Sequence, residues 1–132
     1  MIQKYFEESY VVICWDEEAR CVFIKWNHPE DREFQIALEK GLELLIEKGS
    51  TKWLGDISNI GIMLELGSAW SDVHFYPKAV RAGMKHMALI ATEQQLAKLP
   101  EVTATGQYGG IEYIYHYFTN IGDAKSWLTE FI

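Results

Sequence analysis

The chain has few of the residues that mark disulfide-rich, low-complexity or membrane-spanning proteins. Its 132 residues include two cysteines and three prolines, so neither a secreted disulfide framework nor a proline-rich segment is expected. No apolar run approaches the roughly 18 residues that a transmembrane helix needs, and residues 1–10 lack the charged and then apolar pattern of a signal peptide. These absences favour a soluble, cytoplasmic protein without stable membrane insertion.

Basic residues are also scarce. Twelve Lys and Arg stand against 19 Asp and Glu, which gives a net charge of −7. Nucleic-acid binding depends on Lys and Arg that neutralise phosphates, and no basic stripe is present, so no nucleic-acid partner is expected. The same negative charge disfavours anionic membrane surfaces.

The two cysteines lie seven residues apart, on two runs that are typical of neighbouring β-strands. Cys14 and Cys21 would face each other if the hairpin register allowed it, so a disulfide remains open. Buried, reduced thiols are the favoured interpretation, because free cysteine is among the most buried residue types.

What the chain does have is enough apolar material for a core, arranged in alternating periodicities. Hydrophobic residues make up 48% of the sequence and aromatic residues 14%. The patterns predict strands over residues 10–15, 20–26, 52–57, 85–91 and 111–118, and helices over residues 29–48, 61–83, 92–99 and 120–131, with residues 103–110 as a loop. This order predicts a single α/β domain over residues 1–132, with a mixed, mostly parallel sheet of four to five strands and helices packed on it.

Several local signals fix the ends of these elements. Pro29 suits a first helical position and Gly49 suits a helix end. Thr92 and Gln95 have the spacing of a capping box. Pro77 must break, restart or kink the helix predicted over residues 61–83.

Three segments together resemble a known family. They are Trp53–Ser58 around the central strand, Ala79–Ile90 as a helix followed by a strand, and Tyr117–Phe118 followed by Asp123–Leu128 at the end. On these segments the chain resembles the SpoIIAA-like proteins of the STAS/SEC14-like fold, which are small bacterial α/β domains related to anti-sigma-factor antagonists. The resemblance implies a non-catalytic regulatory or protein-interaction module, and it also permits lipid binding.

One departure from that family concerns phosphorylation. Signalling antagonists carry a serine in an Asp-Ser-Ser-Gly-like turn after the central strand, whereas this chain has Asp56–Glu65 there. Ser58 and Ser68 lie near that position but outside the motif. Partner switching by phosphorylation is therefore not expected.

No catalytic or metal-binding signature accompanies the fold pattern. The four histidines are widely spaced, and no His-x-x-x-His or Cys-x-x-Cys pair supplies converging zinc ligands. No nucleophile elbow, phosphate loop or dinucleotide fingerprint is present, and the glycines of Gly106–Gly110 do not follow a predicted strand. The chain is thus expected to be no enzyme and to need no cofactor and no metal.

The candidate ligand-binding residues lie at or after the central strand, because ligands of open α/β sheets gather beyond the carboxyl ends of the strands. Asp56 would act there as a general base, or it would cap the following turn with Ser58 or Asn59; capping is favoured. The candidates are Trp53, Asp56, Ser58, Trp70, His74 and Tyr76.

The aromatic residues give two candidate functions. Alternation places Tyr113, Tyr115 and Tyr117 on one side of a strand. If no helix covers them, they form an interface for a second copy or another protein, and the chain is an interaction module, expected to form a homo-oligomer. An enclosed apolar pocket would instead indicate a carrier of a small apolar ligand or lipid, and converging polar groups with shifted pKa values would indicate an enzyme.

Overall fold

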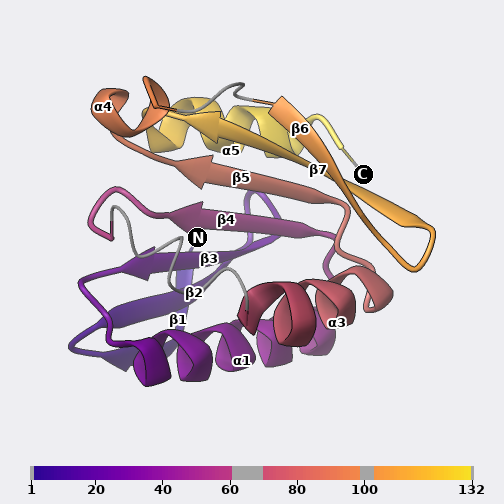
Figure 1. The fold of residues 1–132 in the computed structure, drawn as a ribbon, viewed down its shortest axis with the longest axis horizontal. Helices are drawn as coiled ribbons and strands as arrows, with labels where there is room; N and C mark the ends of the chain where they lie inside the picture. The colour runs from indigo at the N-terminus through magenta and orange to yellow at the C-terminus, as the bar shows by residue number, and fades with distance from the viewer. Residues whose placement is uncertain (1, 61–69, 99–102, 132) are drawn as a thin grey trace.

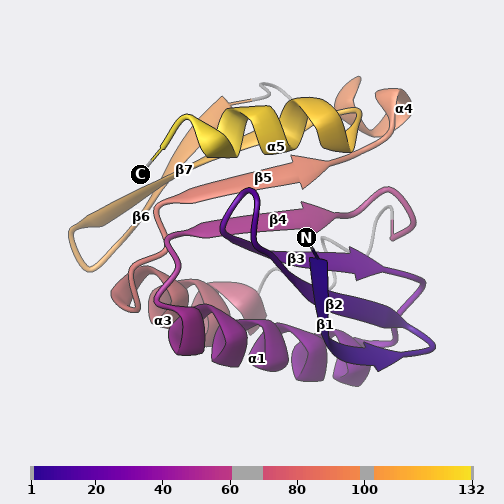
Figure 2. The same cartoon turned by 180° about the vertical axis from the view of Figure 1, so that it is seen from behind.

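The protein is a twisted sheet with helices on both faces (Figures 1 and 2). The computed structural model describes residues 2–60, 70–98 and 103–131. The strands are β1 (Ile2–Glu8), β2 (Val11–Asp16), β3 (Cys21–Trp26), β4 (Lys52–Asp56), β5 (His86–Ile90), β6 (Thr103–Tyr108) and β7 (Ile111–Phe118). The helices are α1 (Asp31–Lys48), the π-helical turn η1 (Ser71–Phe75), α3 (Tyr76–Arg81), α4 (Glu93–Leu96) and α5 (Ile121–Thr129).

The strands form one sheet in the order β1-β2-β3-β4-β5-β7-β6. The pairs β3–β4, β4–β5 and β5–β7 are parallel, and the pairs β1–β2, β2–β3 and β6–β7 are antiparallel. The predicted α/β class is confirmed. The predicted four to five strands and mostly parallel sheet are wrong, because the described residues form seven strands and half of their pairings are antiparallel.

The two additional strands lie at the edges of the sheet. Strand β1 is exposed along its length except at Phe6, so it has no apolar alternation to mark it. Strand β6 was expected to be a loop because of its glycine, yet Gly106 serves packing: a Cβ there would lie 2.2 Å from the Tyr113 ring. The ring of Tyr113 crosses the edge strand at the one position without a side chain, an arrangement known to support edge glycines.

Each face of the sheet has its own apolar cluster. Helices α1 and α3 pack on the face that carries Trp53 and Gly55, which we call the α1 face. Helix α5 packs on the face that carries Leu54, here called the α5 face, and it lies in front of the sheet in Figure 2. Alternation along β4 therefore places Trp53 and Asp56 on opposite faces.

Close contact between α1 and β4 depends on Gly41. A Cβ at this helical position would lie 2.4 Å from Cη2 of Trp53, so the indole lies directly against the helix backbone. Trp53 is buried as a result, and it forms the base of the α1 face near the middle of the sheet.

Most of the predicted helices are confirmed. Helix α1 begins with a capping box formed by Glu30 and Glu33, and it ends at Gly49, whose φ of 62° is left-handed. The capping box of Thr92 and Gln95 is present at α4. The helix predicted over residues 61–83 is seen from Trp70 onward, where η1 gives way to α3 beside Pro77; residues 61–69 lie outside the described part of the chain.

The cysteines do not pair. Both thiols are free, and the register sets Cys14 opposite Phe23 and Cys21 opposite Asp16. A disulfide is thereby ruled out for this fold. Among the helices of the described residues, none is both long enough and apolar enough to cross a membrane.

Candidate functional site

The six candidate residues do not form one site. Trp53 and Tyr76 line a small cavity on the α1 face, whereas Asp56 and Ser58 line a groove at the carboxyl ends of the strands. Trp70 is half-buried against the core of the α1 face, with its ring 5.3 Å from that of an exposed His74. The sequence prediction therefore merged residues that belong to separate features.

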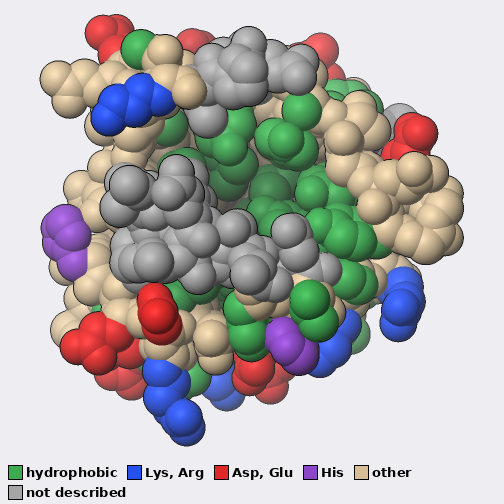
Figure 3. Space-filling view, in the orientation of Figure 1, with side chains coloured by type: hydrophobic (Ala, Val, Ile, Leu, Met, Phe, Trp, Pro, Cys, Tyr) green, Lys and Arg blue, Asp and Glu red, His purple; other side chains and the backbone are tan. Residues whose placement is uncertain are grey.

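The cavity on the α1 face, which we call the apolar hollow, has a volume of about 40 Å³. Its surface is visible as a hollowed apolar area near the middle of Figure 3. The lining residues come from the sheet, from α1 and from η1–α3: Trp26, Phe34, Leu38, Trp53, Gly55, Ile57, Ile60, Ser71, Phe75, Tyr76, Met87 and Leu89. Nearly all of them are apolar or aromatic.

Gly55 keeps the floor of the apolar hollow open. It occupies the α1 face of β4 between Trp53 and Ile57, where any side chain would project into the cavity. A Cβ at this position would lie 3.1 Å from Cδ2 of Leu89 and 3.6 Å from Nε1 of Trp53. The hollow is thus a direct consequence of a glycine in a strand whose neighbours carry large side chains.

Two indoles of the lining donate no hydrogen bond to any residue within 2–60, 70–98 and 103–131. Trp26 and Trp53 are 3% and 2% exposed, and neither Nε1 donates a hydrogen bond to a described residue. Buried tryptophan N–H groups usually find an acceptor. An occupant with a hydrogen-bond acceptor beside an apolar group would therefore pack against the apolar walls of the hollow and accept hydrogen bonds from the indole N–H groups.

A row of tyrosines continues from the hollow along the α1 face. Tyr76 of α3 stacks on Tyr108 and Tyr113, with ring centroids 6.0 and 5.6 Å apart. Tyr115 and Tyr117 extend the row along β7, each half-buried. The predicted shared side of the β7 tyrosines is confirmed, and burial raises the pKa of the Tyr117 phenol, with the neighbouring Tyr115 acting in the same direction.

The groove at the carboxyl ends of the parallel strands is polar, and its polar groups are committed to local structure. Asp56 Oδ1 accepts hydrogen bonds from the Ser58 N–H at 3.1 Å and from its Oγ at 2.6 Å. The groove, of about 490 Å³, is also lined by Thr92 and Asn120, which cap α4 and α5. Asp56 therefore caps a turn, and the backbone N–H and the hydroxyl of Ser58 both donate to the same carboxylate oxygen.

Two of the four histidines, His86 and His116, are engaged in packing. The His86 ring stacks on Phe131 at 3.6 Å, and His116 Nδ1 contacts Oγ1 of Thr103. Burial lowers the pKa of both imidazoles. No group of three His, Cys, Asp or Glu side chains within residues 2–60, 70–98 and 103–131 is placed to hold a metal ion.

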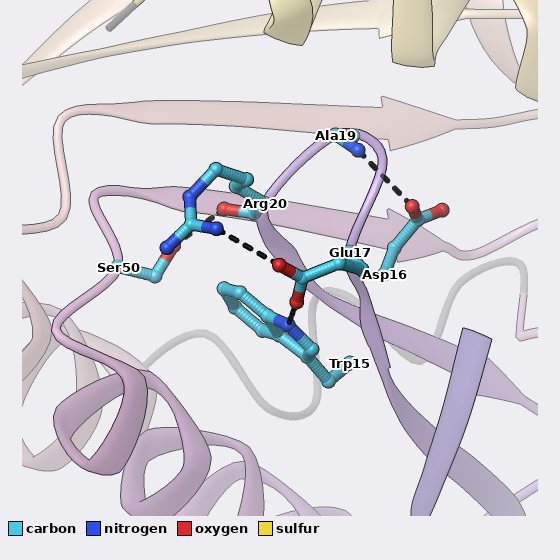
Figure 4. Close-up of polar contacts among 6 residues, drawn as sticks. All are labelled: Trp15, Asp16, Glu17, Ala19, Arg20 and Ser50. Carbon is cyan, nitrogen blue, oxygen red and sulfur yellow. Dashed lines mark hydrogen bonds and ion pairs between the residues drawn. The ribbon is translucent and has the colours of Figure 1, made fainter. Parts of the chain in front are cut away.

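No pattern in the sequence indicates the buried polar cluster that lies at the amino ends of the strands. Asp16 is fully buried; its Oδ1 accepts from the Ala19 N–H at 3.1 Å (Figure 4), and its Oδ2 lies 2.9 Å from Nζ of Lys125. The hydrogen bond to Asp16 raises the pKa of Lys125, while burial raises the pKa of Cys21 to about 12. The ion pair joins β2 to α5, a contact that no local pattern specifies.

In comparisons with known proteins, no family model, no curated protein and no solved structure matches the chain.

Proposed function

We propose that the protein is a non-catalytic interaction module that receives an apolar side chain of a protein partner in the apolar hollow. The observation that carries the proposal is the combination of apolar walls with two indoles, Trp26 and Trp53, that donate no hydrogen bond to a described residue, beside the tyrosine row. An apolar side chain and its own backbone carbonyl would supply both kinds of contact. Anchoring residues of this kind dominate the energetics of protein interfaces.

The size of the hollow favours a side chain over a whole lipid. Sites for small organic ligands enclose about 300–1,000 Å³, whereas the hollow measures about 40 Å³. That volume accepts the end of one apolar side chain. A lipid carrier, the second function considered from the sequence, would need a cavity many times larger.

The half-buried tyrosine row supports the proposal that the partner contacts a surface larger than the hollow itself. Tyrosine is enriched in protein interfaces because it combines apolar area with a polar hydroxyl. Tyr115 pairs with Met87 and Tyr117 pairs with Leu89 across the β5–β7 register, so the row is continuous with the lining of the hollow. A second copy of the chain is the simplest partner for such a surface, and we propose a homo-oligomer.

We further propose that the chain is a distant SpoIIAA-like protein that acts in a bacterial cytoplasm. The support is the resemblance of Trp53–Ser58, which forms β4 and its turn, and of Asp123–Leu128, which lies in α5. The commitment of Asp56 and Ser58 to each other supports a role without catalysis and without phosphorylation-controlled switching.

The test is a titration with two probes, followed by the indole N–H signals of Trp26 and Trp53 in ¹H–¹⁵N NMR spectra. N-acetyl-phenylalanine amide represents the side chain of a partner, and palmitate represents a lipid. We expect saturable shifts with the first probe and no stoichiometric binding of the second. Tight binding of palmitate would support the carrier and contradict the proposal.

Gly55→Val provides the matched variant, because its side chain fills the floor of the hollow beside Leu89. Gly122→Ala is the control: it adds a Cβ on the opposite face, in α5, where the side-chain oxygen Oδ1 of Asn120 would lie 3.3 Å away. Gly55→Val should abolish the shifts and Gly122→Ala should retain them. Equal shifts in the two variants would show that the probe binds elsewhere.

A further inference from the structure

A second cavity lies at the amino ends of the parallel strands, at the edge opposite to the polar groove. It measures about 300 Å³, and its lining residues are Trp15, Arg20, Lys48, Gly49, Ser50, Thr51, Lys52 and Phe131. Three of these described residues are cationic, in a chain whose net charge is −7. No carboxylate is among the described lining residues, although acidic side chains outnumber basic ones over the whole chain.

Lys52 distinguishes this cavity from an ordinary basic surface. The residue is 6% exposed, and its ammonium makes no ion pair or hydrogen bond with any residue of the described chain. Lys4, Lys40 and Lys125, by contrast, each lie within 4.0 Å of a carboxylate. Lys52 is thus a buried residue whose charge has no ion pair among the described residues, although lysine is rarely buried unless it is paired.

The surroundings of Lys52 disfavour its charge. Burial lowers the pKa of the Lys52 ammonium; among nearby groups Cys21 acts to raise it and Arg20 to lower it further. Its register partner on β5 is His86, whose buried Nδ1 also lacks a hydrogen-bond partner within the described residues. Lys52 thus lines the cavity with a charge that its surroundings disfavour and no described residue neutralises, and an anion in the cavity would supply the missing counter-ion.

Hydrogen bonds connect the residues at the rim of the cavity to one another. Glu17 accepts hydrogen bonds from Trp15 Nε1 at 2.5 Å and from Arg20 Nη1 at 3.0 Å, and Ser50 Oγ donates to the Arg20 carbonyl at 2.9 Å (Figure 4). The carbonyls of Leu45 and Ile46 at the end of α1 accept the N–H groups of Ser50 and Gly49. The negative end of that helix is therefore capped by its own chain.

We propose that this cavity binds a small phosphate monoester, with the phosphoryl group held between Lys52, Lys48 and Arg20. Two ammonium groups, together with the guanidinium N–H groups of Arg20 that do not donate to Glu17, match the double charge of a phosphoryl dianion. Phe131 supplies an apolar wall for the organic part of the ligand. The volume lies at the lower end of the range for small-molecule sites, which excludes large nucleotides.

The experiment titrates the folded full-length protein with inorganic phosphate, phenyl phosphate and acetate at constant ionic strength, with sodium chloride as the balancing salt. Backbone amide shifts of residues 49–52 report binding at the cavity. We expect saturable shifts with both phosphates and tighter binding of phenyl phosphate. Absence of saturation with both phosphates would overturn the proposal, and acetate binding as tightly as phosphate would overturn the assignment of a dianion.

Lys52→Met is the decisive variant, because methionine keeps the length of the buried stem and removes the charge. It should weaken phosphate binding by at least roughly tenfold. Lys78→Met, which removes an exposed charge on α3, is the matched control and should leave affinity unchanged. Equal affinity of wild type, Lys52→Met and Lys78→Met would overturn the site.

Lys48→Gln is the alternative variant if Lys52→Met does not fold. Lys48 is exposed, so its substitution should not disturb the core. Its phosphate affinity should fall by less than that of Lys52→Met but more than that of Lys78→Met. An affinity equal to that of Lys78→Met would contradict the proposed role of Lys48 and place the anion elsewhere.

Discussion

Gly41→Ala tests how α1 and β4 together position the wall of the apolar hollow. In an exposed helix this substitution would stabilise the protein by about 1 kcal/mol, because alanine has the higher helix propensity. Here the new Cβ would lie 2.4 Å from Cη2 of Trp53, well inside the 3.0 Å below which such contacts essentially never occur. Over-packing of a core costs typically about 1–3 kcal/mol. With the upper value for so close a contact, we expect a net loss of about 2 kcal/mol.

The assay is urea unfolding followed by far-UV circular dichroism, with the free energy taken from the midpoint at an unchanged m-value. A double-mutant cycle with Trp53→Phe isolates the contact, because the smaller ring removes the clash. Gly41→Ala should then be neutral or stabilising in the Trp53→Phe background. If Gly41→Ala stabilises the wild type by about 1 kcal/mol, Trp53 does not lie against α1 as described.

Three further predictions concern the rest of the structure. Asp16→Ala should lower the free energy of unfolding by about 1–3 kcal/mol, because the Ala19 N–H loses its acceptor and Lys125 keeps only the exposed Glu18. In chemical denaturation, a loss below about 1 kcal/mol, as for an exposed pair, would contradict the buried pair. Burial raises the pKa of the Cys21 thiol from 9.0 to about 12, so between these pH values the folded state keeps a proton that the unfolded state loses. The free energy of unfolding should therefore fall as the pH rises from 9 to 12. In thermal unfolding, Cys21→Ala should make this fall less steep, and an unchanged pH profile would refute the raised pKa of Cys21. Thr92→Ala should cost about 1 kcal/mol through loss of the cap that Thr92 Oγ1 offers to the Gln95 N–H, and an unchanged melting temperature would count against that cap.

Local signals in the sequence were sufficient for the central elements. The capping box at Thr92, the terminator Gly49 and the apolar alternation of β7 each act within a few residues, so each can be recognised without the fold. The α/β class follows from the alternation of these elements. The tyrosines of β7 share a face for the same reason, since alternation is a property of any strand.

The edge strands and the polar cluster depended on distant residues. Strand β6 exists because Gly106 makes room for Tyr113 of the neighbouring strand, a relation that a glycine alone does not reveal. Asp16 is buried because Lys125, 109 positions later, reaches it from α5. Pairings between distant residues of this kind leave no periodic trace in the sequence.

The candidate site was only partly predicted, because it too depends on residues that are distant in the sequence. Proximity along the chain suggested that Trp53 and Asp56 act together, but the pleat sends them to opposite faces of β4. The role of Asp56 as a cap was recognised because its partner Ser58 is two residues away. The apolar hollow was not predicted, because it depends on Gly55 together with helices α1 and α3.

The most direct measurement of the central claim is a set of intermolecular nuclear Overhauser effects between N-acetyl-phenylalanine amide and the protein. The proposed function predicts contacts from the phenyl ring to the Trp53 indole and to the Leu89 methyl groups, which border the hollow on two strands. Contacts confined to other surfaces, with none to Trp53 or Leu89, would contradict the assignment of the apolar hollow as the docking site.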